Sequence, residues 1–182
     1  MQTRRKQLEN ELLVLRCCQG DSVAFSQLVA NWQERLWQYA YRLTLSDAAA
    51  YDIAQETWCA AVVGLRKLKD VDAFPSWLFG IHHRKCVDWI RKEQRRIRKT
   101  RALSERANPN SDPPNNEEQD LLEVAIRKLP ADRKALIALR YKEGFSAEQI
   151  AEVLGIPAGT VKSRLQRTID KLRTLVEQES HE

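Results

Sequence analysis

Apolar residues recur every three or four positions along most of the chain, which is the spacing of amphipathic α-helices. This pattern predicts an all-α protein. Four helices are expected in the first half, at about residues 5–18, 21–43, 47–68 and 75–98. In the first of them, Leu8, Leu12 and Leu15 fall on one side and form the expected apolar face.

The segment 146–173 has the pattern of two helices joined by a tight turn. Ser146 and Gln149 have the spacing of a capping box, Gly155 stands where a left-handed residue ends a helix, and Pro157 suits the start of the next one. Two short helices, ending at Pro130 and Gly144, are expected to support this helix–turn–helix. The second helix has a regular apolar stripe made of Val161, Leu165, Ile169 and Leu172.

The other faces of that second helix are polar and basic. Residues 158–173 hold five basic side chains and one acidic side chain, a net charge of +4. A slender basic helix in this motif predicts DNA binding in the major groove. We expect Lys162, Ser163 and Gln166 to reach base edges, and Thr160, Arg164 and Arg167 to meet flanking phosphates.

Charge is distributed in blocks, which indicates separate parts of the chain. The 182 residues carry a net charge of +5. Residues 75–106 hold 10 basic and three acidic groups, whereas residues 107–123 hold five acidic groups and no basic one. Within residues 100–119, the Pro- and Asn-rich stretch at 108–116 has no apolar surface to bury and cannot hold a helix. We therefore expect two small helical domains, 1–99 and 120–182, joined by a flexible acidic linker at 100–119.

Two groups of polar residues have spacings that enzymes or metal sites also use. Asp52, Gln55 and Glu56 share one helix face, so the carboxylates are either an acid–base pair, metal ligands or a partner-binding surface. No Glu-x-x-His motif or second acidic helix supports the first two readings. His82, His83 and Cys86 have a spacing compatible with zinc, but no fourth ligand is evident. We expect no catalytic residue, metal or cofactor.

The cysteines and the lengths of the apolar segments indicate the compartment in which the protein acts. The four cysteines include no C-x-x-C pair and are interpreted as reduced thiols, which is typical of a cytoplasmic protein. No apolar run approaches the length of a membrane span, so no membrane insertion is expected.

Several segments, in their order and spacing, resemble a bacterial RNA polymerase sigma factor of the extracytoplasmic-function group. Residues 51–58, YDIAQETW, resemble the segment that in this family grips core polymerase. Residues 74–81, FPSWLFGI, and 87–92, VDWIRK, resemble the helix that reads and opens the −10 promoter element. Residues 129–165 resemble the region that reads the −35 element.

The resemblance implies how these surfaces are used. Asp52, Gln55 and Glu56 would bind the clamp helices of the beta-prime subunit of core RNA polymerase, and the beta subunit is a further expected contact. The −10 DNA would meet the basic helix through Arg84, Lys85, Asp88, Arg91 and Lys92. The protein would perform no covalent step, act in a stress or envelope response, and be restrained by an anti-sigma factor.

Two other functions remain open from the residues alone. One is a stand-alone helix–turn–helix regulator that binds DNA without polymerase. The other is an enzyme that uses Asp52 and Glu56. Promoter-specific initiation by purified core polymerase is expected only of a sigma factor.

Overall fold

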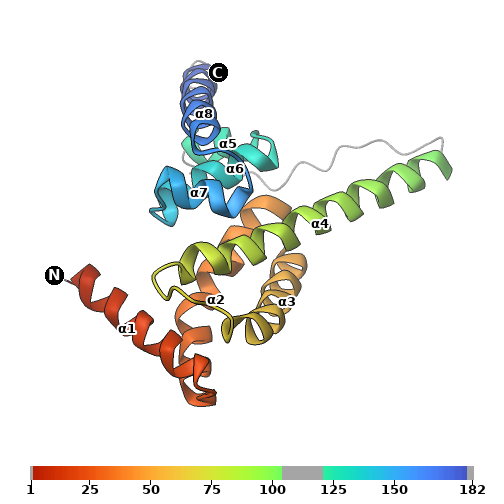
Figure 1. Cartoon of the computed structure of the whole chain (residues 1–182). Helices are drawn as coiled ribbons and strands as arrows, with labels where there is room; N and C mark the ends of the chain where they lie inside the picture. The colour runs from red at the N-terminus through yellow and green to blue at the C-terminus, as the bar shows by residue number, and fades with distance from the viewer. Residues whose placement is uncertain (1, 104–120, 180–182) are drawn as a thin grey trace.

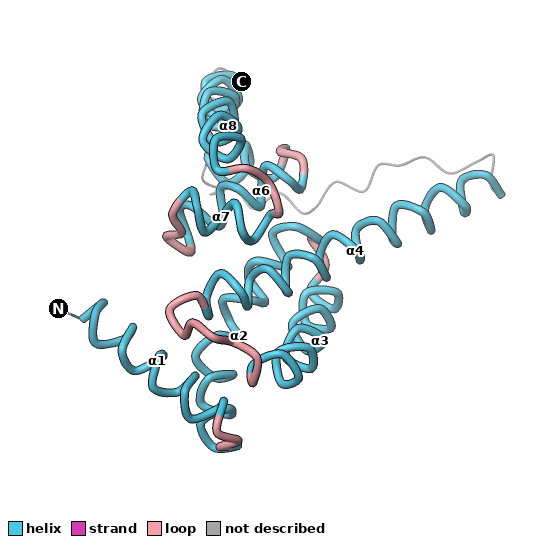
Figure 2. The backbone as a smooth tube through the Cα atoms, in the orientation of Figure 1, coloured by secondary structure: helices cyan, strands magenta, loops and turns pink. Residues whose placement is uncertain are grey.

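A computed structural model describes residues 2–103 and 121–179 of the chain, and every regular element in these ranges is helical (Figures 1 and 2). The expected all-α fold is confirmed. The elements are α1 (Gln2–Cys18), α2 (Ser22–Thr44), α3 (Asp47–Leu65), α4 (Phe74–Leu103), α5 (Leu121–Arg127), α6 (Ala131–Ile137), the π-helical turn η1 (Ala138–Lys142), α7 (Ala147–Leu154) and α8 (Ala158–Glu179). None of the described helices is both long and apolar enough to cross a membrane.

Short-range capping contacts fix where the first helices begin. The Asp21 carboxylate accepts hydrogen bonds from the backbone N–H groups of Val23 and Ala24 at the start of α2. The Ser46 hydroxyl accepts one from Ala49 at the start of α3. Both side chains satisfy N–H groups that have no partner within the helix. Between the two helices the chain reverses at Leu45, which is left-handed with φ of +54°, and Ser46. Helices α2 and α3 therefore pack against each other (Figure 1).

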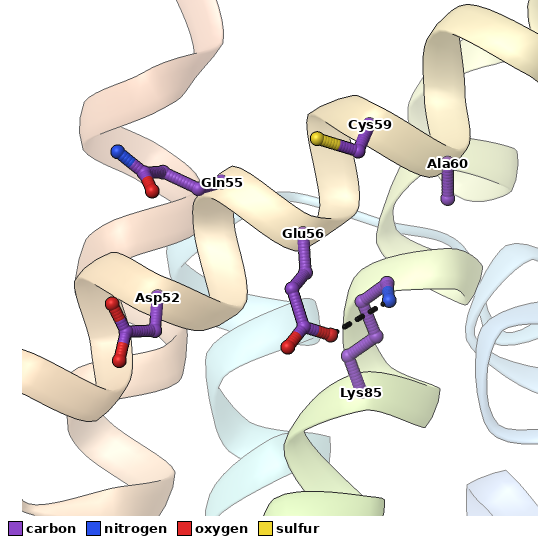
Figure 3. A pocket seen from close by; sticks show the side chains of 6 residues that line it. All are labelled: Asp52, Gln55, Glu56, Cys59, Ala60 and Lys85. Carbon is purple, nitrogen blue, oxygen red and sulfur yellow. Dashed lines mark hydrogen bonds and ion pairs between the residues drawn. The ribbon is translucent and has the colours of Figure 1, made fainter.

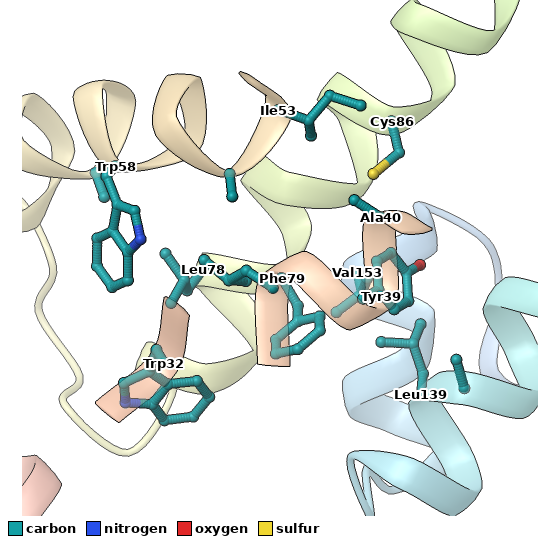
Figure 4. Packing of buried hydrophobic residues seen from close by; sticks show 14 of the residues in the cluster. Trp32, Tyr39, Ala40, Ile53, Trp58, Leu78, Phe79, Cys86, Leu139 and Val153 are labelled. Carbon is teal, nitrogen blue, oxygen red and sulfur yellow. The ribbon is translucent and has the colours of Figure 1, made fainter. Parts of the chain in front are cut away.

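Helices α2, α3 and α4 enclose an apolar core rich in aromatic rings (Figure 4). Trp32 and Tyr39 of α2 meet the edge or face of Phe79 from α4, with ring centres 6.4 and 5.4 Å apart. Such edge-to-face pairs are worth about 0.5–1.5 kcal/mol beyond the area they bury. This core holds α4 rigidly across α2 and α3.

The helix–turn–helix forms as its capping signals predict. The Ser146 hydroxyl accepts from the Gln149 N–H, and the Gln149 side chain accepts from the Ser146 N–H. Gly155 ends α7 in the left-handed conformation, with φ of +66°. Val161 and Leu172 of α8 are buried, so the stripe of that helix faces the supporting helices.

The two halves of the chain pack against each other, a contact that no sequence pattern predicts. Phe79 of α4 meets Phe145, just before α7, edge to face at 5.3 Å. Arg35 of α2 donates two bonds to one oxygen of Glu143, from Nη2 at 2.6 Å and from Nε at 2.8 Å. Val153 of α7 also belongs to the core cluster that includes Phe79 (Figure 4).

Three expected boundaries or faces differ in the structure. Leu8, Leu12 and Leu15 are 58, 58 and 48% exposed, because α1 packs on its neighbours through Val14 and Cys17 instead.

Helix α3 ends at Leu65 rather than at residue 68, since Lys67 and Leu68 bond to carbonyls three residues back and tighten the turn. Helix α4 continues to Leu103, beyond residue 99, because its Arg, Lys and Gln residues are good helix formers. The rest of the expected linker lies outside the described residues.

Candidate functional site

The polar face of α3 is exposed, as its spacing predicted. Asp52, Gln55 and Glu56 all lie on it and, with Cys59 and Ala60, line one side of an open hollow of about 560 Å³ (Figure 3). Within the described chain, the side chains of Asp52 and Gln55 make no hydrogen bond or ion pair. Their polar groups are therefore available to a partner.

Lys85 of α4 closes the other side of this hollow. Its Nζ lies 2.9 Å from Oε2 of Glu56, and the two side chains are 27 and 68% exposed (Figure 3). The structure therefore brings together two residues to which the sequence assigned different partners. An exposed pair of this kind contributes about 0–1 kcal/mol, so a competing partner can displace it.

The other basic residues predicted for −10 DNA lie along the exposed side of α4. Arg84, Arg91 and Lys92 are exposed. Asp88 is exposed as well and sits 4.0 Å from Arg91, at the limit of an ion pair. These side chains share a helix with Lys85 but not its hollow.

His82 links the three helices of the core and is not available to a metal. It is fully buried, with Nε2 donating to the Leu36 carbonyl at 2.8 Å and Nδ1 2.8 Å from the Thr57 hydroxyl. Burial lowers the pKa of His82 to about 4, so the ring is neutral at pH 7. In a neutral ring with Nε2–H as donor, Nδ1 is an acceptor facing the Thr57 hydroxyl, whose single proton is shared between Nδ1 and the Ile53 carbonyl at 2.7 Å.

His83 and Cys86 have separate surroundings. The Tyr39 hydroxyl lies 2.9 Å from Nδ1 of His83, and burial lowers the pKa of that histidine to about 4 as well. Burial raises the pKa of Cys86 to about 12, which keeps it a thiol. In the described ranges, no three His, Cys, Asp or Glu side chains are placed to hold a metal ion.

Helix α8 presents the residues predicted to read the −35 element. Lys162, Ser163, Gln166 and Arg167 are exposed, and Thr160 and Arg164 are half-buried. Lys162 pairs loosely with Glu148 at 3.5 Å, and Gln166 donates to Asp170 at 3.1 Å. The base-reading candidates therefore point outward.

Arg133 of α6 fixes α8 from behind. Its Nη1 donates to the Arg164 carbonyl at 3.0 Å and to the buried Thr168 hydroxyl at 2.9 Å. These contacts hold the orientation of the recognition helix. Sequence reasoning missed this residue, because nothing around Arg133 distinguishes it from a surface arginine.

Comparisons with known protein families match both halves of the chain. The family model of Sigma-70 region 2 matches residues 28–96, and that of Sigma-70, region 4 matches residues 119–172. The first match contains α3 and most of α4, and the second contains α7 and most of α8.

Two relatives align over nearly their whole lengths. An ECF RNA polymerase sigma-E factor of Haemophilus influenzae is 29% identical over 189 residues, covering 94% of this chain and 97% of the relative. The ECF RNA polymerase sigma factor SigW of Bacillus subtilis is 29% identical over 167 residues, covering 85% of this chain and 89% of the relative.

Solved structures agree with these matches. CnrH in complex with the cytosolic domain of CnrY superposes with a TM-score of 0.66 at 26% identity, covering 93% of this chain and 98% of that one. The sigma factor RpoE in complex with the anti-sigma factor NepR, from Bartonella quintana, gives the same TM-score and identity over 84% of this chain and 96% of that one. The chain therefore belongs to the sigma-70 family, as a sigma factor of the extracytoplasmic-function group that acts in transcription initiation.

Proposed function

We propose that the chain binds core RNA polymerase through Asp52, Gln55 and Glu56 of α3. The observation that carries this proposal is the exposed polar face beside an open hollow, where Asp52 and Gln55 have no partner among the described residues. Two carboxylates and an amide suit a partner helix that offers basic and hydrogen-bonding side chains. No covalent step is needed, and the protein works in the cytoplasm beside polymerase.

Each half of the chain binds one of the two promoter elements. Arg84, Lys85, Asp88, Arg91 and Lys92 of α4 lie along the −10 element, where the cations neutralise phosphates of the opened strand. In α8, the side chains assigned to the −35 element are Thr160, Lys162, Ser163, Arg164, Gln166 and Arg167. The exposure of most of these side chains supports the assignment.

The packed arrangement of the two halves has to open for both elements to be read at once. Positions −10 and −35 are separated by about 25 base pairs, or about 85 Å at about 3.4 Å per pair. Helix α4, with 30 residues, spans about 45 Å at about 1.5 Å per residue, only about half of that distance. Binding to core polymerase and promoter therefore competes with the contacts between α4 and α7.

RpoE was solved in complex with the anti-sigma factor NepR, and CnrH in complex with the cytosolic domain of CnrY. We therefore expect an anti-sigma factor to regulate this chain. In this chain, such a partner would cover the α3 face or hold the two halves together.

A core-binding titration tests the polymerase contact. Reversing Asp52 and Glu56 to Lys should weaken binding to purified core polymerase strongly while leaving the circular dichroism spectrum and the melting temperature nearly unchanged, because both side chains are exposed. Glu34→Lys, a reversal at another exposed carboxylate, on α2, is the control. Unchanged affinity in the double variant would remove the α3 face from the interface.

A further inference from the structure

The end of α4 carries a stripe of positive charge that extends past the residues assigned to the −10 element. At 100° per residue, Arg84, Arg91, Arg95 and Arg98 lie within about 60° of one another around the helix, and Lys92 and Lys99 border them. Every side chain from Gln94 to Thr100 is exposed. Figure 1 shows this end of α4 extending away from the other helices.

Two acidic residues lie near the stripe, and neither pairs with its last three cations. Asp88 lies on the same face, 4.0 Å from Arg91. Glu93 lies on another side of α4 and is held by Arg96, whose Nη2 and Nε donate to its two oxygens at 2.6 and 2.8 Å. Arg95, Arg98 and Lys99 form no ion pair with any residue of the described chain. The charge of these three side chains is therefore uncompensated by residues 2–103 and 121–179.

This arrangement has a cost that packing does not explain. Like charges three or four residues apart, such as Arg91 with Arg95 and Arg95 with Lys99, destabilise a helix by about 0.2–0.5 kcal/mol per pair. Cations favour the negative end of a helix dipole, but that effect acts within the last turn. The stripe begins several turns before Leu103, where α4 ends. Binding of a ligand with regularly spaced negative charges accounts for the stripe better than the helix dipole does.

We infer that Arg95, Arg98 and Lys99 bind the phosphate backbone of duplex DNA in the spacer between the −10 and −35 elements. This inference rests on the proposed function. The chain leaves α4 at its basic end and continues to the half that reads the −35 element, so this end of α4 points toward the spacer. From Arg91 to Arg98 the helix rises about 10.5 Å, which matches about three base pairs.

The test measures how salt weakens the binding of the holoenzyme, core polymerase plus this chain, to fluorescent promoter DNA. One template keeps the spacer duplex, and the other begins at the −10 element. The variant Arg95→Gln/Arg98→Gln/Lys99→Gln should make the slope of log Kobs against log salt shallower by about 2.7 on the template with the spacer, about 0.9 per lost phosphate contact. On the template without it, the slope should not change.

Adjacent arginines supply a matched control. Arg95→Gln should lower the slope by about 0.9 on the spacer template, whereas Arg96→Gln, the same charge change on the side that pairs with Glu93, should not.

Equal effects of Arg95→Gln and Arg96→Gln, equal effects on both templates, or a loss of core binding by the triple variant would each overturn the inference. Failure of the proposed function would look different, because the wild-type chain itself would then fail to direct core polymerase to the promoter.

Discussion

Replacing Arg35 with alanine should loosen the packing between the two halves of the sigma factor. The Arg35 guanidinium binds Glu143 at 2.6 and 2.8 Å and stacks 4.2 Å from the ring centre of Trp32. The Glu143 side chain is only 4% exposed, whereas that of Arg35 is 38% exposed. Without Arg35, the Glu143 carboxylate stays buried with no cation beside it unless the halves separate.

The burial of Arg35 and Glu143 sets the free-energy cost of losing their ion pair. An exposed ion pair is worth about 0–1 kcal/mol, and leaving a buried charged group unpaired costs more than about 1–3 kcal/mol. Because Arg35 is more than one third exposed, we discount the larger figure to about 1–2 kcal/mol. At about 1.4 kcal/mol per factor of ten, the equilibrium shifts toward the separated state by about 5- to 30-fold.

Removing the other partner of the ion pair, Glu143, should shift the equilibrium toward the separated state less. In Glu143→Ala, Arg35 keeps its contact with Trp32 and reaches water, so the shift should stay below about fivefold. The double variant should resemble Glu143→Ala rather than the sum of the two, since removing both partners leaves no buried charge.

Single-molecule FRET between labels at Val63 of α3 and Lys171 of α8, both exposed, reports the separation. Equal shifts for the two single variants, or no shift with Arg35→Ala, would refute this reasoning.

Two further predictions concern the core and the recognition helix. The folded-state pKa values of His82 and His83 both lie near 4, below the unfolded value near 6.5, so stability is full above pH 6.5 and falls between pH 6.5 and 4. From pH 7.5 to 5, urea unfolding should show a loss of about 2 kcal/mol for each ring, or about 4 kcal/mol for the two together. Thr57→Val should cost about 1–3 kcal/mol, because it leaves Nδ1 of the buried His82 without the hydroxyl beside it. In α8, Arg167→Ala should weaken binding to all −35 sequences alike and lower the salt slope by about 0.9, whereas Lys162→Ala or Gln166→Ala should change which sequence is preferred by about 1–3 kcal/mol, as measured on a −35 library.

Local signals allowed much of the fold to be predicted. The capping box of Ser146 and Gln149, the left-handed Gly155 and the caps Asp21 and Ser46 act between residues a few positions apart. Their effect is therefore visible in the sequence. The exposed face of Asp52, Gln55 and Glu56 also followed from helical spacing, although its role remains a prediction.

Contacts between distant segments could not be predicted in this way. Arg35 and Glu143 are 108 positions apart, and neither residue type nor spacing pairs them. The π-helical turn that precedes Glu143 leaves no periodic pattern either. Burial of His82 was missed because a histidine beside another histidine and a cysteine also suits a metal site, and only the positions of Leu36 and Thr57 decide between the two.

The most direct test of the central claim is transcription by purified core polymerase on a library of promoters with randomised −10 and −35 elements, with and without the chain. We predict that specific start sites appear only when the chain is present, and that sequencing of the transcribed templates reveals a preferred sequence at both elements. Start sites that do not depend on the chain, or binding of the chain to DNA without any initiation, would contradict its function as a sigma factor.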